Sequence, residues 1–194
     1  QIDTKQLYSL AGVSDDAEHE ESIYLIGRNR AMWLGINLIT AVLASLVIGL
    51  FDATIQSFVA LAVLMPIVAS MGGNAGTQTL TVTVRQMALG EIDYQDAKKI
   101  IYKEVMISVV NGLLFAAVIG VVAYLWFNIP LLGVVIAISM IINLFSAGFF
   151  GAVIPIVLQK KGIDPAIGST VILTTVTDVV GFFSFLGLAT LILL

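Results

Sequence analysis

Five long apolar stretches constrain this chain more than any other feature of its sequence. An α-helix needs about 20 apolar residues to cross a hydrocarbon core of roughly 30 Å, and each stretch reaches that length. Of the 194 residues, 59% are hydrophobic and only 11% are charged, whereas soluble domains carry about 25% charged residues. The sequence therefore predicts an all-α membrane protein with five transmembrane helices, over residues 31–51, 55–84, 98–127, 130–158 and 169–194.

The last stretch carries a single carboxylate, Asp178, near its middle. A charged aspartate at the centre of a bilayer costs about 2.5–3.5 kcal/mol on insertion scales, so it normally faces a partner or a water-filled path. Thr170, Thr174, Gly181 and Ser184 share its helix face and form a narrow stripe of polar and small residues. This pattern favours a functional carboxylate. The alternative is an aspartate that is protonated or hydrogen-bonded to a neighbouring helix for packing.

The second stretch is interrupted by Pro66 and by the run MGGNAGTQT. Proline removes a helical hydrogen bond, and glycine lets helix backbones or ions approach closely. Asn74 and Gln78 add neutral oxygens. Such a segment is tolerated at membrane depth only where protein or a water cavity surrounds it. We therefore expect a broken or tightly packed helix that lines water, with Gly73 and Thr77 on it; a packing seam of small residues is the alternative.

Other polar residues in the apolar stretches have open interpretations. Glu104, near the charged start of the third stretch, either snorkels or pairs with Lys103, or stands at the inner mouth of a pathway. Asp164 precedes a proline, which is typical of a turn or a helix start. The third stretch places four residues on one face: Glu104, Ser108, Asn111 and Phe115. The fourth places Ser139, Asn143 and Ser146 on one face, and we expect Asn143 to make polar packing between helices.

The basic residues predict how the chain is oriented. With five spans, all nine Lys and Arg fall on the side of the N-terminal segment, and the opposite loops, near Asp52 and Asn128, have none. The positive-inside rule then places the N-terminus in the cytoplasm and the C-terminus outside a plasma (inner) membrane. We expect residues 1–29, which include an acidic run, to be a cytoplasmic linker or a weak cation- or partner-sensing segment, and residues 30–194 to form the membrane domain.

The composition also limits the chemistry. The chain has no cysteine, and its single histidine, His19, lies outside the apolar stretches, so a metal site must use oxygen ligands, which suit hard cations. A net charge of −4 argues against nucleic acid. No catalytic motif is present, so we expect no enzyme. A two-fold dimer would bring two copies of Asp178 together, and about −2 charge in a low-dielectric setting matches a divalent cation.

Several motifs carry a family resemblance. They are the run PIVASMGGNAGTQTLTVTVRQMALGEID, Tyr102-Lys103-Glu104, the block from Gly162 to Pro165, and the block from Thr177 to Gly181. Over residues 24–194 the sequence resembles the MgtE family of magnesium channels and transporters. The resemblance implies a homodimer in membrane lipid, with a central Mg²⁺ pore formed mainly by the second and fifth helices of both protomers. Mn²⁺ or Ca²⁺ are the expected substitutes.

The resemblance also implies roles for single residues. Asp178 matches the selectivity aspartate, Thr174 a carbonyl-contributing position, and Asp164 an aspartate that binds Mg²⁺ at the cytoplasmic mouth, where Glu104 also lies. The expected pore-lining residues are Thr170, Thr177, Gly181, Gly73, Asn74, Thr77 and Gln78. The family's cytoplasmic sensory domains are expected to be absent from this chain, with the N-terminal ten residues resembling the end of the family's plug helix.

Three functions follow as hypotheses. The leading one is passive Mg²⁺ transport through a dimeric pore with a partly hydrated cation at Asp178. The second is a coupled transporter that exchanges Mg²⁺, Mn²⁺ or Co²⁺ for Na⁺ or H⁺. The third is a structural membrane module without ion flux.

Overall fold

The computed structural model describes residues 7, 9–13 and 22–194, and this part of the chain is helical, without strands. Its five long helices are apolar enough to cross a membrane, which confirms the predicted fold class of a multi-pass, all-α membrane protein. They are α3 (Ile23–Gly49), α5 (Val59–Ala88), α6 (Ala97–Phe127), α7 (Pro130–Lys160) and α8 (Ser169–Leu193). The short elements α4 (Asp52–Ser57) and η1 (Tyr94–Asp96) lie in connections. The predicted acidic run and most of the predicted plug-helix remnant lie outside the described residues.

Two helices differ from their predictions. Helix α3 begins at Ile23, not near residue 31, because Ser22 caps it by accepting a hydrogen bond from the Leu25 backbone N–H at 3.4 Å. Helix α5 is continuous through Pro66, so the expectation of a broken helix is wrong. A proline within a long membrane helix removes only one backbone hydrogen bond, which the neighbouring helices compensate.

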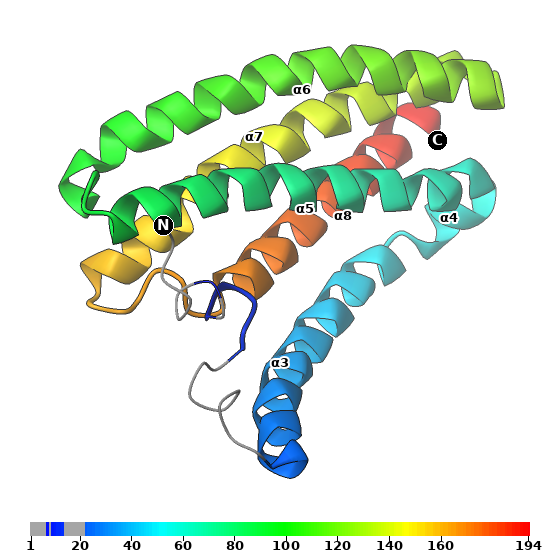
Figure 1. The fold of residues 1–194 in the computed structure, drawn as a ribbon. Helices are drawn as coiled ribbons and strands as arrows, with labels where there is room; N and C mark the ends of the chain where they lie inside the picture. The colour runs from blue at the N-terminus through cyan, green and yellow to red at the C-terminus, as the bar shows by residue number, and fades with distance from the viewer. Residues whose placement is uncertain (1–6, 8, 14–21) are drawn as a thin grey trace.

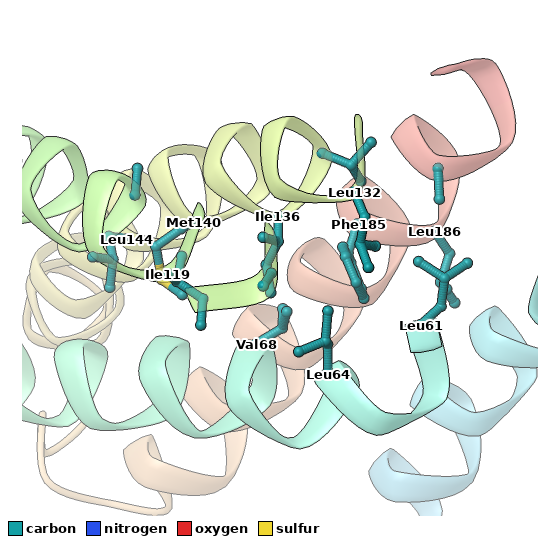
Figure 2. Close-up of a cluster of buried hydrophobic side chains, with 14 residues drawn as sticks. Leu61, Leu64, Val68, Ile119, Leu132, Ile136, Met140, Leu144, Phe185 and Leu186 are labelled. Carbon is teal, nitrogen blue, oxygen red and sulfur yellow. The ribbon is translucent and has the colours of Figure 1, made fainter. Parts of the chain in front are cut away.

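Helix α7 is the centre of the bundle (Figure 1). It packs against α5, α6 and α8, and α5 also packs against α8. Helix α3 lies at the side and packs on α8. The main apolar cluster joins α5, α6, α7 and α8, and ten of its members are labelled in Figure 2: Leu61, Leu64, Val68, Ile119, Leu132, Ile136, Met140, Leu144, Phe185 and Leu186. Lipid is as apolar as these side chains, so close van der Waals packing stabilises the contacts.

Small residues bring α6 and α7 close together. A Cβ atom at Gly133 would lie 2.6 Å from the Gly120 carbonyl oxygen, so the two backbones approach at a distance that only glycine permits. The buried side of α6 then follows steps of four residues, from Ile100 through Glu104, Ser108 and Gly112 to Ala116. Of the four residues that the sequence places on one face of α6, only Glu104 and Ser108 are buried in this packing. Asn111 and Phe115 are exposed, because a ridge of four-residue steps turns away from them.

Candidate functional site

Asp178 lies beside the packing seam of α8. The seam residues Leu173, Thr177, Gly181 and Phe185 recur every four residues and are buried, and Asp178 follows Thr177 on the edge of this seam, half-buried. Within the described part of the chain, Asp178 makes no hydrogen bond and no ion pair. The interpretation of Asp178 as an aspartate hydrogen-bonded to a neighbouring helix therefore finds no support among these residues.

The threonines of α8 divide between the seam and its edge. Thr177 is fully buried, and its Oγ1 donates a hydrogen bond to the Thr174 carbonyl oxygen at 3.1 Å. Thr170 and Thr174 are half-buried, on the same side as Asp178. Within one protomer, Thr177 and Gly181 thus face neighbouring helices, whereas Thr170, Thr174 and Asp178 remain partly accessible.

A row of exposed polar side chains lies on α5. Ser70, Asn74, Thr77 and Gln78 are all exposed. Asn74 Nδ2 donates to Ser70 Oγ at 3.2 Å, and Thr77 Oγ1 donates to the Gly73 carbonyl oxygen at 2.8 Å. Together with Thr81 and Val82, three of these side chains line an open concavity of about 460 Å³. Polar side chains in this position make α5 unsuited to face lipid with this side.

The three glycines of α5 have different surroundings. A Cβ atom at Gly72 would lie 2.8 Å from Asn143 Oδ1, and one at Gly76 would lie 2.9 Å from Leu173 Cδ2. A Cβ atom at Gly73 would meet nothing within 4 Å. Gly72 and Gly76 are therefore packing glycines, which the small-residue interpretation anticipated, whereas Gly73 opens on the same side as the exposed polar row.

Two close contacts show which part of α5 is level with Asp178. A Cβ atom at Gly181 would lie 3.0 Å from Val68 Cγ1, and one at Gly76 would lie 2.9 Å from Leu173. The helices are antiparallel, and these two contacts bracket Asp178 on α8. The two turns of α5 between Val68 and Gly76, which carry Gly73 and Asn74, therefore lie close to the depth of the carboxylate.

Glu104 of α6 lies against the packed side of α5, opposite the exposed polar row. It is buried, and its Oε2 accepts a hydrogen bond from Thr79 Oγ1 at 3.3 Å, which joins α6 to the packed face of α5. Among the described residues it forms no ion pair, so the predicted pairing with Lys103 is not found. It lines a cavity of about 240 Å³ with five other polar residues and two isoleucines: Gln86, Glu91, Asp96, Lys99, Lys103, Ile92 and Ile100.

Asp164 lies in the turn before α8. Its Oδ1 accepts a hydrogen bond from the Ala166 backbone N–H at 3.0 Å, and α8 itself begins at Ser169 after Gly168. Asp164 therefore stabilises a turn and does not cap the helix. It also lines a cavity of about 230 Å³ beside the last turn of α5, which includes Met87. A carboxylate near the negative end of a helix dipole is a favourable surrounding for a cation.

One contact of the N-terminal segment was missed by sequence reasoning. Trp33 packs against Gly12 and Gly168, which both have positive φ. The Gly168 N–H donates to the Ser9 carbonyl oxygen at 3.1 Å, and Leu10 is buried in a cluster with residues of α5 and α8. The only sequence signals were the glycines themselves, which do not reveal their partner.

Among the described residues, no group of three or more His, Cys, Asp or Glu side chains could hold a metal ion. Asp178 therefore belongs to no cluster of three such side chains in this part of the chain. A cation beside this carboxylate would take its remaining oxygen ligands from water or from a second copy. Such a site suits Mg²⁺, which dehydrates reluctantly and usually keeps several waters.

The fold and the site define a multi-pass membrane protein. Two of its membrane helices, α5 and α8, carry polar side chains that the rest of the bundle does not fully cover. Residues 65–188 match the family model for MgtE, which is described as a divalent cation transporter. This match covers well over half of the chain. The chain therefore belongs to the MgtE family, which confirms the resemblance drawn from its sequence motifs.

The curated relatives that match are called magnesium transporter MgtE. The protein of Bacillus subtilis is 32% identical over 180 residues, which are 93% of this chain and 40% of the relative. That of Thermus thermophilus is 31% identical over 164 residues, 84% of this chain and 36% of the relative. That of Enterococcus faecalis is 30% identical over 183 residues, 94% of this chain and 40% of the relative. The chain thus spans well under half the length of these relatives.

Proposed function

We propose that this chain conducts Mg²⁺ passively across the plasma membrane through a pore built by two copies, with Asp178 of each copy at the shared axis. One observation carries the proposal: Asp178 is half-buried and has no hydrogen bond or ion pair with the described residues, and it lies close to the depth of Gly73 and Asn74 on the exposed polar side of α5. The names of the relatives and the description of the family support Mg²⁺ as the cargo.

The cost of leaving these groups in lipid favours a second copy. An ionised aspartate at the bilayer centre costs about 2.5–3.5 kcal/mol on insertion scales, and the exposed amides of Asn74 and Gln78 add to that cost. Pairing two copies about a two-fold axis would remove both surfaces from lipid and enclose water between them. Helices α5 and α8 of each copy would then form the wall of the pore.

Two carboxylates at the axis would select a divalent cation by charge. Two aspartates contribute about −2, which a single divalent ion neutralises. Hydroxyl and carbonyl oxygens of Thr170 and Thr174, with the amides of Asn74 and Gln78, would bind the outer waters of the ion. Because most ligands would be water, binding would stay weak enough for the ion to leave, which conduction requires.

The basic residues support an orientation with the ends of α5 and α7 in the cytoplasm. Arg85 and Lys160 lie in the last turns of these helices, and the opposite loops are free of basic residues. The positive-inside rule then puts the N-terminus in the cytoplasm and the C-terminus outside. Asp164, beside the last turn of α5, would attract cations to the cytoplasmic mouth.

Flux measurements on the purified chain in liposomes test the proposal. A Mg²⁺ indicator inside the vesicles records uptake after Mg²⁺ is added outside. We expect Asp178→Asn to abolish uptake while the protein stays folded. The matched control is Asp52→Asn, the same change at an exposed carboxylate that bonds Gln56 Nε2 at 2.9 Å. Full uptake by Asp178→Asn would refute the pore assignment, and uptake that requires a Na⁺ or H⁺ gradient would favour the coupled transporter.

A further inference from the structure

Asn143 of α7 lies where three helices meet. Its side chain is fully buried, and its Nδ2 donates a hydrogen bond to the Val68 carbonyl oxygen of α5 at 2.8 Å. This bond confirms the prediction of polar packing between helices at Asn143. Ser139 and Ser146, on the same face of α7, are buried as well. Asn143 differs from Ser139 because its bond crosses to another helix, whereas Ser139 Oγ bonds the Val135 carbonyl oxygen of its own helix.

Two glycines on two different helices make room for this amide. A Cβ atom at Gly72 of α5 would lie 2.8 Å from Asn143 Cγ, and one at Gly181 of α8 would lie 3.2 Å from the same atom. The amide therefore touches the backbones of α5 and α8 at once. Its size and its bond to Val68 determine how closely these two helices approach.

This contact lies one turn from Asp178. Gly181 follows Asp178 by three residues on α8, and Val68 Cγ1 would lie 3.0 Å from a Cβ atom at Gly181. The α7 side chain at 143 thus lies between the backbones of α5 and α8 close to the depth of the carboxylate.

The amide of Asn143 does not maximise the stability of the fold. Asn143 Oδ1 is buried and has no hydrogen-bond partner among the residues that the structure describes. An unpaired buried acceptor is costly, because it loses its hydrogen bonds to water without gaining a partner in the protein. The residue therefore contributes a fixed geometry between helices more than it contributes free energy of folding.

We propose that Asn143 is a positioning residue for the Asp178 site, which sets the separation of α5 and α8 around that carboxylate. The inference rests on the proposed function, because it concerns how the pore holds its cation. Asn143 acts through the positions of Asp178 and the α5 polar row, without touching the ion.

The first test compares Asn143→Leu with the control Ser139→Ala in liposomes. We expect Asn143→Leu to keep or raise the thermal unfolding temperature, while the half-saturating Mg²⁺ concentration and the Mg²⁺ to Ca²⁺ flux ratio each shift by about two- to tenfold, the range that one hydrogen bond supports. Ser139→Ala, which removes a hydroxyl that bonds its own helix, should shift neither. Unchanged half-saturation and selectivity in a folded Asn143→Leu protein would overturn the inference.

The second test needs no Mg²⁺ flux. The chain has no cysteine, so Asp178→Cys introduces a single thiol, and a water-soluble methanethiosulfonate reagent measures its reactivity with and without Asn143→Leu. We expect the thiol to react, and its reaction rate to change at least about twofold when Asn143→Leu is also present. This factor corresponds to the net free energy of one hydrogen bond. Equal rates would overturn the positioning role alone. A thiol that is unreactive in both backgrounds, beside a reactive Gln56→Cys control, would overturn the proposed pore and the inference with it.

Discussion

Alanine at each of the three α5 glycines should have a different effect, although the glycines share one short motif. A Cβ atom at Gly72 would lie 2.8 Å from Asn143 Oδ1, which is about 0.7 Å closer than the 3.5 Å of a favourable contact. The Asn143 amide is held by its bond to Val68, so it cannot move aside easily. A Cβ atom at Gly76 would lie 2.9 Å from the end of the Leu173 side chain, which no hydrogen bond holds in place. A Cβ atom at Gly73 meets nothing within 4 Å.

These distances set the expected magnitudes. Overpacking costs about 1–3 kcal/mol, and replacing a helical glycine by alanine returns about 0.5–1 kcal/mol. Gly72→Ala should therefore lower the free energy of unfolding by about 1–2 kcal/mol, and Gly76→Ala by less. Gly73→Ala should raise it by up to about 1 kcal/mol. Because Gly73 lies on the same side of α5 as the polar row, the methyl group added by Gly73→Ala should narrow the proposed pore. The substitution should therefore lower Mg²⁺ flux without lowering stability.

The assay measures both properties on the same preparations. Thermal unfolding in detergent gives the order of stability, and Mg²⁺ uptake in liposomes gives the flux. The expected result is a stable but slow Gly73→Ala protein beside a destabilised Gly72→Ala protein. If Gly73→Ala were destabilised as much as Gly72→Ala, then Gly73 would be a packing glycine and the assignment of the open face of α5 would be refuted.

Three further predictions concern the rest of the bundle. Thr79→Val removes the hydroxyl that bonds Glu104 and should destabilise the α5–α6 contact by about 0.6–1.7 kcal/mol, the range measured for such bonds in a membrane protein; a double-mutant cycle with Glu104→Leu in thermal unfolding should show this coupling, and additive effects would contradict it. Gly168→Ala adds backbone strain at φ +59° and a clash with Trp33, so it should lower the unfolding temperature. Adding Trp33→Ala should partly restore that temperature, and no restoration would contradict the contact. Mg²⁺ uptake driven only by its own gradient should be unchanged when Na⁺ and H⁺ gradients are collapsed, and dependence on either would contradict a passive pore.

The sequence predicts the membrane helices well, because their ends coincide with clear signals. Helix α7 begins at Pro130, and α6 begins after Asp96, as the charged loop and the proline indicate. The start of α3 is less predictable. Arg28 and Arg30 end the apolar stretch but do not end the helix, because a helix continues into water until a capping residue such as Ser22 stops it.

The site is predictable in residue type but not in arrangement. Asp178 stands out because a carboxylate in an apolar stretch is costly. Gly72 and Gly73 are neighbours of the same type, and only the helix opposite decides that one is packed and the other open. The same holds for Glu104, whose partner Thr79 is 25 residues away in the sequence and reaches it through the packing of α5 and α6 against α7.

The position of a divalent cation relative to two copies of Asp178 tests the proposed function most directly. A structure of the chain in lipid with Mn²⁺, located by its anomalous signal, would provide it. We expect one ion on a two-fold axis between the two carboxylates, with ordered water between the ion and the carboxylate oxygens and no direct bond from the ion to either Asp178, as suits a cation that keeps several of its waters. An axis that leaves Asp178 against lipid, or a dimer without an ion beside it, would contradict the dimeric pore.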